Sequence, residues 1–212
     1  PPGRRPLLGP GAGTPSPAWS AARYEDAVRT AVVAWKDRGR ADLTPVLAAA
    51  LRRAVQAALA EAGGETAGHE VLLVPAPSSR RARRERGRDP VRELARRCGL
   101  ALRRRGLDVR ALPALAHAHR VADQAHLGVA DRARNLAGAV RVSRGWQPRL
   151  AGRRCLVVDD VVTSGATVLE CARALREVGA VVVGAAAVAD TPRRGELSAV
   201  RASRAVDPPM SA

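Results

Sequence analysis

Four stretches of the chain carry hydrophobic side chains at the three- and four-residue spacing of an amphipathic helix. The second stretch follows Thr44-Pro45, where Thr is a good helix cap and Pro suits the first turn, and Gly63-Gly64 ends it. The third follows Asp89-Pro90, which has the same two properties, and the fourth closes at Gly179. These signals predict helices over 24–35, 44–61, 90–98 and 168–178.

Between the helices lie short, continuous apolar runs such as Val71-Leu72-Leu73-Val74. Runs of this length suit strands that are buried on both faces. Strands that alternate with helices at this spacing predict parallel βαβ units. The predicted strands are 71–74, 156–158 and 181–188. We therefore expect an α/β fold with a central, mainly parallel sheet flanked by helices.

The two ends of the chain differ in composition from the middle. Residues 1–20 lack the hydrophobic core of a secretion signal and begin without Met, so we expect a disordered leader or a trimmed boundary. Residues 191–212 are polar and contain Pro, which predicts a flexible tail. Residues 21–190 are then one domain of ordinary size. No apolar run approaches the roughly 18 residues that span a bilayer, so no membrane contact is expected.

The chain is strongly basic, with 36 Lys and Arg against 20 Asp and Glu and a formal net charge of +16. Lys36 is the only lysine, and abundant Ala, Arg, Gly and Val resemble a GC-rich coding bias, so codon bias is the alternative to a functional origin for the arginine excess. The positive field should still attract polyanions and predicts weak contact with single-stranded DNA. A dedicated base-stacking surface is not expected, because the chain has no Phe and one Tyr.

The chain has three cysteines, Cys98, Cys155 and Cys171, which are odd in number and far apart. This spacing predicts neither a disulfide framework nor a zinc site. Each lies among apolar residues, so we expect small buried side chains in a reducing cytoplasm.

The stretch CLVVDDVVTSGATVLECARAL, residues 155–175, carries the most specific chemistry. Asp159 and Asp160 follow a predicted buried strand, and such a pair suits vicinal hydroxyls or a nearby divalent cation. The loop 163–167 opens the next helix, where free N–H groups favour an anion and Gly165 permits close approach. Acids for a diol beside a phosphate loop predict a ribose 5-phosphate site. The candidate ligand-binding residues are Asp159, Asp160, Thr163, Ser164, Gly165, Ala166 and Thr167.

Residues 156–167 resemble the phosphoribosyl pyrophosphate (PRPP) motif of type I phosphoribosyltransferases: hydrophobic residues, two acids, two hydrophobic residues and a Thr/Ser-Gly loop. From about Tyr24 to Asp190 the chain resembles the ComF family, phosphoribosyltransferase-like proteins associated in many bacteria with DNA uptake in competence. The wider resemblance rests on the segments 35–39, 71–79, 86–90 and 124–138, the last reading Q-x-x-L…R-x-x-N-x-x-G. It implies a type I phosphoribosyltransferase-like fold with a small hood region.

The resemblance also implies site residues beyond the PRPP motif. Pyrophosphate contacts are expected from Lys36, Arg80 and Arg86, although a solvated charged face is the ordinary alternative for such a charge run. The family pattern alone suggests roles for Gln124, Arg132 and Asn135. Mg²⁺ is implied as the cofactor, held by Asp159 and Asp160 indirectly through the oxygens of the substrate.

Several departures from the family pattern change what is expected. No Cys precedes Cys98, so the paired-cysteine zinc segment of many relatives is absent from the sequence given. The family's Arg-Gly-Phe/Tyr-Asn-Gln is degraded at 88–90, where we interpret Asp89 as a helix cap. Thr163 stands where purine-salvage relatives carry an acid, which weakens a 6-oxopurine assignment. His117, in a segment with His119 and His126, is interpreted as part of a flexible polar loop or mobile hood.

Two classes of function remain open. In the first, the protein is a cytoplasmic, Mg²⁺-dependent phosphoribosyltransferase acting on PRPP or a related ribose 5-phosphate in nucleotide metabolism or DNA uptake. In the second, it is a non-catalytic PRPP-fold module that engages single-stranded DNA or a DNA-handling partner such as a competence helicase. A homodimer is a further expectation. Neither an acceptor base nor a catalytic residue is identified.

Overall fold

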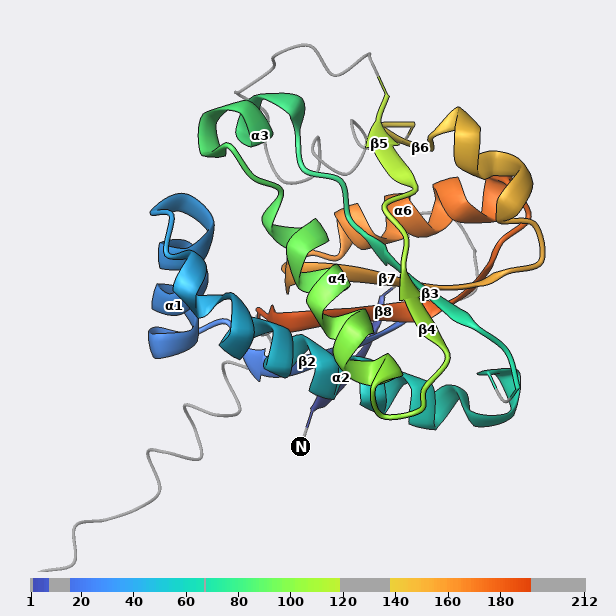
Figure 1. Ribbon diagram of the computed structural model, residues 1–212, viewed down its shortest axis with the longest axis horizontal. Helices are drawn as coiled ribbons and strands as arrows, with labels where there is room; N and C mark the ends of the chain where they lie inside the picture. The colour runs from blue at the N-terminus through green and yellow to red at the C-terminus, as the bar shows by residue number, and fades with distance from the viewer. Residues whose placement is uncertain (1, 8–15, 67, 119–137, 192–212) are drawn as a thin grey trace, which may run out of the picture.

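A computed structural model describes residues 2–7, 16–66, 68–118 and 138–191, without the side chains of 64–66 and 80 (Figure 1). The strands are β1 (Gly3–Leu7), β2 (Ser16–Arg23), β3 (Val71–Pro75), β4 (Val109–Ala111), β5 (Leu115–His117), β6 (Val140–Val142), β7 (Arg154–Val162) and β8 (Val181–Asp190). The helices are α1 (Asp26–Asp37), α2 (Thr44–Thr66), α3 (Arg80–Arg86), α4 (Pro90–Arg103) and α6 (Ala166–Glu177), with 3-10 helices η1 (Ala41–Leu43) and η2 (Arg144–Arg149).

The central sheet has six strands in the order β1-β2-β8-β7-β3-β4. All neighbouring pairs are parallel except β1 and β2, which are antiparallel. A separate two-stranded antiparallel sheet pairs β5 with β6. The expectation of an α/β fold with a mainly parallel central sheet is therefore confirmed.

Helices cover both faces of this sheet, so its central strands are buried on both faces (Figure 1). On one face α2 and α4 pack against β2, β8, β3 and β4, and on the other α6 packs against β7 and β8. The side chains of β7 divide between the two layers: Leu156 and Val158 join the first core, and Cys155 and Val157 join the second. Burial on both faces explains why this strand is continuously apolar instead of alternating.

The acid pair lies within β7 and not beyond its end, which corrects the expected strand boundary. Asp159 is paired with Ala187 of β8, and the ladder continues to Val162 opposite Asp190. The apolar run ends at Val158, but the backbone pairing goes on because β8 extends alongside it. The predicted helices and the strands 71–74 and 181–188 correspond to α1, α2, α4, α6, β3 and β8.

The expectation of a disordered leader over 1–20 is wrong for the described part of that segment. Strand β2 lies beside β8, with Ala18 opposite Ala185 and Trp19 opposite Ala186, and β1 adds to its outer edge. Trp19 and its small neighbours Ala18 and Ser20 are buried. These residues carry few apolar atoms and stand among Pro and Gly, so the sequence shows no strong strand pattern here. Pairing with the edge of β8 satisfies the hydrogen-bonding groups of their backbone. The folded unit thus extends upstream of residue 21.

Helix α3 was also missed, because its sequence RRARRER has no apolar stripe. Ser79 caps it by accepting a hydrogen bond from the Ala82 N–H at 3.1 Å, and Gly87 ends it at φ 64°. Among the helices that the structure describes, none is long and apolar enough to cross a membrane. Of the expected flexible tail, 191–212, residues 192–212 lie outside the described residues. Thr191, its first residue, is described, and its N–H donates to the carbonyl oxygen of Val162 at 3.1 Å.

Candidate functional site

A cavity of about 450 Å³ opens at the carboxyl ends of β3 and β7, beside α1 and α3. Parallel α/β sheets place ligands at this edge. The walls are contributed by α1, the loop after β3, helix α3 and the end of β7 with the loop that follows it. The residues predicted for the site that line this cavity are Lys36, Arg86, Asp159, Asp160, Thr163 and Thr167. The structure thus brings together residues more than a hundred positions apart in the sequence.

Asp160 is held by a cation from another element. Asp160 is only 2% exposed, and Nζ of Lys36 on α1 lies 2.5 Å from Oδ2 of Asp160. Its Oδ1 accepts a hydrogen bond from the Val161 N–H at 3.0 Å. The Asp160 N–H in turn donates to Oδ1 of Asp159 at 2.8 Å. A carboxylate buried this deeply needs such partners, because burial of an unpaired charge is costly.

The two acids differ in their electrostatic surroundings. Burial, followed by the charge and hydrogen bonding of Asp160, raises the pKa of Asp159 well above the usual value, and Lys36 offsets only part of this effect. Burial opposes the charged form of Lys36, but Asp160 outweighs it, so the pKa of Lys36 is raised. The cavity therefore holds one tight ion pair and one carboxyl group that lacks a full counter-charge.

The phosphate loop has the predicted position at a helix N-terminus. Helix α6 begins at Ala166, whose N–H donates to Oγ of Ser164 at 3.3 Å. Gly165 has φ +83°, which favours glycine, and a Cβ there would lie 2.7 Å from Cδ2 of Leu7. Thr163 and Thr167 line the cavity, while the space beside Gly165 is filled by Leu7. Both the backbone turn and its packing thus require glycine.

Arg5 of β1 supports the phosphate loop and was missed in the sequence. Its Nη2 donates to the carbonyl oxygens of Thr163 at 2.6 Å and Val162 at 3.0 Å, and its Nη1 donates to that of Thr191 at 3.2 Å. Because Leu7 of the same strand packs on Gly165, two residues of β1 hold the loop that leads into α6. The sequence offered little signal for this role, because β1 and β2 carry Pro, Gly and small side chains around Trp19 and so show no strong strand pattern.

Of the three basic residues expected at a pyrophosphate subsite, two line the cavity. Lys36 and Arg86 line the cavity, and Nη2 of Arg86 lies 3.1 Å from Oδ1 of Asp37. The side chain of Arg80 lies outside the described part of the structure. Gln124, Arg132 and Asn135 fall in 119–137, also outside it.

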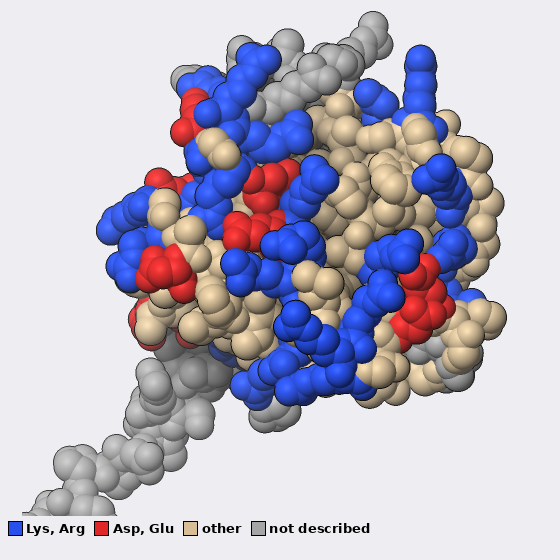
Figure 2. Space-filling view, viewed as in Figure 1, with Lys and Arg blue, Asp and Glu red and all other residues tan. Residues whose placement is uncertain are grey.

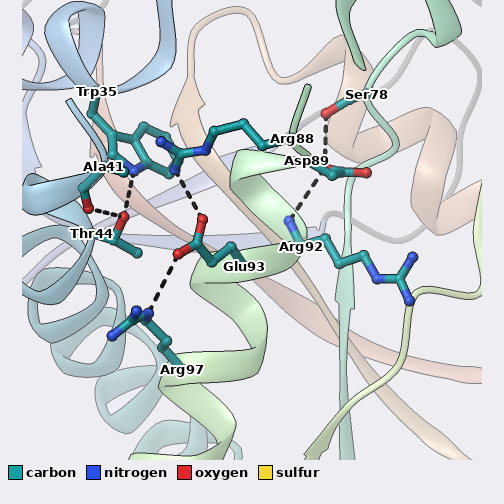
Figure 3. Close-up of polar contacts among 9 residues, drawn as sticks. All are labelled: Trp35, Ala41, Thr44, Ser78, Arg88, Asp89, Arg92, Glu93 and Arg97. Atoms are coloured by element: carbon teal, nitrogen blue, oxygen red, sulfur yellow. Dashed lines mark hydrogen bonds and ion pairs between the residues drawn. The ribbon is translucent and has the colours of Figure 1, made fainter. Parts of the chain in front are cut away.

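A polar network anchors helix α1 and so fixes the position of Lys36 (Figure 3). The buried Trp35 donates from Nε1 to Oγ1 of Thr44 at 3.0 Å, and the Arg88 guanidinium lies 5.4 Å from the centre of its ring. Arg88 also donates to Oε2 of Glu93 at 3.0 Å. These contacts join α1 to α2 and α4, so Arg88, in the degraded family motif, has a structural role.

The interpretations of Asp89 and His117 made from the sequence have opposite outcomes. Asp89 does cap α4, since its Oδ1 accepts from the Arg92 N–H at 3.4 Å (Figure 3). The interpretation of His117 as part of a flexible polar loop is wrong. It ends β5, and its Nε2 lies 2.8 Å from the carbonyl oxygen of Pro77, because pairing of β5 with β6 brings it to the loop after β3.

The donor set suits a cation that is held mainly by its ligand. Asp159 and Asp160 offer carboxylate oxygens, which Mg²⁺ prefers. Within the described residues there is no group of three or more His, Cys, Asp or Glu that would hold a metal ion. A bound Mg²⁺ would thus depend on phosphate or hydroxyl oxygens of the ligand for most of its shell. The residues present fit this arrangement.

Comparison with known proteins agrees with the geometry. The family model for the phosphoribosyl transferase domain matches residues 117–205, which include the acid pair, the phosphate loop and α6. A stretch of 39 residues is 54% identical to Transcriptional regulator GfcR of Methanococcoides burtonii and covers 18% of this chain. The chain spans only 19% of the length of that curated relative. The α/β fold, the cavity and the domain match together support a phosphoribosyltransferase-like family.

Proposed function

We propose that the cavity beside β7 binds PRPP or a related ribose 5-phosphate together with Mg²⁺. The observation that carries this proposal is that the acid pair and two threonines of the phosphate loop, Thr163 and Thr167, line one cavity of about 450 Å³. This volume lies in the range of about 300–1,000 Å³ that is typical of small-molecule sites.

Each part of the cavity has a distinct task in this proposal. Asp159 and Asp160 accept hydrogen bonds from the ribose hydroxyls. The N–H and hydroxyl groups of the loop 163–167 donate hydrogen bonds to the 5-phosphate. Lys36 and Arg86 place positive charge where pyrophosphate oxygens would lie. Mg²⁺, when bound with the ligand, neutralises phosphate charge.

The first candidate activity is transfer of the phosphoribosyl group. The bond between C1 of the ribose and the pyrophosphate oxygen breaks, pyrophosphate leaves with the electron pair, and an incoming nucleophile forms the new bond to C1. Lys36 and Arg86 would stabilise the negative charge that develops on the leaving group, and the acid pair would hold the ribose still. The nature of the nucleophile is left open.

The second candidate is a non-catalytic module in which the same ligand controls contact with DNA or a DNA-handling partner. The match to a protein named as a transcriptional regulator favours it. Basic side chains, spread over much of one face with acidic ones among them, would serve such a role (Figure 2). A ComF-type part in DNA uptake, Mg²⁺ dependence, a cytoplasmic location and a homodimer are further components of the proposal.

Calorimetric titration with PRPP, with and without Mg²⁺, tests the shared ligand. Wild-type protein should bind PRPP, and Asp159→Asn with Asp160→Asn should abolish binding, whereas the exposed Asp108→Asn should not. Retention of affinity within a few-fold in the double variant would contradict the assignment of the acids. Pyrophosphate release over a panel of nucleobases then separates a transferase from a binding module.

A further inference from the structure

The outer face of α4 carries an exposed leucine between two pairs of arginines. Leu100 is 46% exposed, and its neighbours three and four positions away along the helix are Arg96, Arg97, Arg103 and Arg104. Residues at these spacings lie side by side on a helix surface, so the arginines flank the leucine on both sides. We propose that these five residues, the Leu100 patch, dock an acidic amphipathic helix of a protein partner. The inference does not rest on the ribose 5-phosphate site, because none of the five lines that cavity.

The helix keeps its regular geometry across the whole Leu100 patch. The Arg104 N–H donates to the carbonyl oxygen of Leu100 at 3.2 Å, so Arg104 continues the helical hydrogen bonding. The opposite side of α4 is fixed in the core, where Cys98 and Leu102 are buried. At 1.5 Å per residue, the patch from Arg96 to Arg104 is about 12 Å long, or about two turns. It therefore presents a rigid surface of the size that one partner helix can cover.

The positive charge of the Leu100 patch is mostly uncompensated. Arg97 pairs with Glu93, whose Oε1 lies 3.5 Å from Nε of Arg97, but Glu93 is shared with a second arginine. Within the part of the chain that the structure describes, no acid forms an ion pair with Arg96, Arg103 or Arg104. Basic side chains gather in Figure 2 over the region where Figure 1 places α4. A partner of complementary charge must therefore bring carboxylates or other anions.

The central leucine decides which anionic partner fits. A nucleic-acid backbone offers phosphate charge but no apolar surface for Leu100, and an anionic membrane holds a helix through a broader apolar face than one leucine. A second copy of the same patch would place arginines against arginines, which repel. A helix with an apolar seam flanked by Glu residues supplies an apolar contact for Leu100 and carboxylates for the arginines. Guanidinium groups bind carboxylates through paired hydrogen bonds, which favours this partner further.

Fluorescence anisotropy with a labelled synthetic peptide tests this assignment in the full chain. The peptide has about three heptads, with Leu at positions a and d and Glu at e and g. Wild-type protein should bind it with a dissociation constant below about 1 mM, and Arg103→Ala with Arg104→Ala should weaken binding at least about fivefold. The matched control is Arg141→Ala with Arg144→Ala, which removes the same charge from exposed arginines of β6 and η2. This control should leave the affinity within about twofold.

The substitution Leu100→Ser separates the proposed contact from a general attraction between opposite charges. It keeps the charge and should weaken peptide binding at least about threefold, because the partner no longer buries a leucine side chain. Circular dichroism should show that the fold is retained, and binding of a single-stranded oligonucleotide should stay unchanged.

Three outcomes would overturn the proposal. Equal losses in the two arginine pairs, or full peptide affinity in Leu100→Ser, would show a diffuse electrostatic effect. Oligonucleotide binding that is tighter than peptide binding and is lost in Arg103→Ala with Arg104→Ala would assign the Leu100 patch to nucleic acid. Binding to phosphatidylserine vesicles that is tighter than peptide binding and is weakened by Leu100→Ser would assign it to a lipid surface.

Discussion

Nη2 of Arg5 donates a hydrogen bond to the carbonyl oxygen of Thr163 at 2.6 Å, which ties the strand nearest the N-terminus to the phosphate loop. The contact lies next to the packing of Leu7 on Gly165. Together they hold the chain where it turns from β7 into α6. The N–H groups of the loop can meet an anion without prior ordering only if this turn is fixed, so β1 is a positioning element for the site.

Replacement of Arg5 should therefore weaken anion binding while the cavity residues stay intact. We expect Arg5→Ala to lower the affinity for inorganic phosphate or PRPP about tenfold, because the carbonyl oxygens of Val162, at the end of β7, and Thr163, in the loop, lose their donor. Arg5→Lys should recover part of the loss. The matched control is Arg4→Ala on the same strand, since Arg4 pairs with Glu61 and lies over Trp19. Calorimetry measures the affinity, and an equal effect of both substitutions would show that only general destabilisation is at work.

The ion pair of Lys36 and Asp160 should appear as a coupling energy in a double-mutant cycle. Lys36→Met leaves the Asp160 carboxylate buried without its cation, and we expect the loss of this partner to lower the free energy of unfolding by about 1–3 kcal/mol. The lower end is favoured because the Lys36 side chain is 34% exposed and solvent screens part of its charge. Lys36→Met with Asp160→Asn should cost less than the sum of the single changes. Denaturant unfolding measures all four proteins, and strict additivity would contradict the coupling.

The local part of the site was predictable, and the partners of the acid pair were not. Residues 156–167 form a strand, a turn and a helix start that are contiguous in sequence, so their residue types specify the local geometry. The contact of Lys36 with Asp160 depends on where α1 packs. That packing depends on Trp35 meeting Thr44 of α2 and Arg88, which itself pairs with Glu93 of α4. No periodicity in the chain encodes such a long-range arrangement.

The N-terminal strands show a second reason why sequence patterns fall short. Strand β2 is stabilised by pairing with β8, which lies more than a hundred residues later in the sequence. Its burial pattern rests on Trp19 and very small side chains, which carry little hydrophobic signal. By contrast, β3 and β7 are buried on both faces and their apolar runs were sufficient to predict them.

The raised pKa of Asp159 gives the stability a defined pH dependence. The folded state holds the proton of this carboxyl more tightly than the unfolded state, so the contribution of Asp159 to stability falls as the pH rises from the ordinary pKa of 3.8 through the raised folded value. Asp159→Asn removes this cost. We expect the variant to melt at a higher temperature than wild type at pH 8, with the difference shrinking toward pH 4. A variant that is less stable at pH 8 would show that the ionised carboxylate stabilises the fold.

The three cysteines should react slowly in the native state. All are buried, and burial raises the pKa of Cys98 and of Cys155 to about 12 and raises that of Cys171 as well. Since the thiolate is the reactive form, Ellman's reagent at pH 8 should modify almost none of them within minutes. In guanidinium chloride all three should react at once. Rapid modification of one thiol in the folded protein would reveal local opening around it.

Binding of single-stranded DNA should be weak, non-specific and independent of the ribose 5-phosphate cavity. The net charge of +16 provides the attraction, and the affinity should fall with salt by a slope of about −0.7 for each neutralised phosphate. Fluorescence anisotropy with a labelled oligonucleotide measures this slope. Asp159→Asn with Asp160→Asn should leave the DNA curve almost unchanged, because these acids line the cavity and are largely removed from the exterior.

Removal of the exposed Arg103, Arg104 and Arg105 should flatten the slope by at most about 2. Competition between PRPP and DNA for one site would instead point to the loop after β3 as their shared contact.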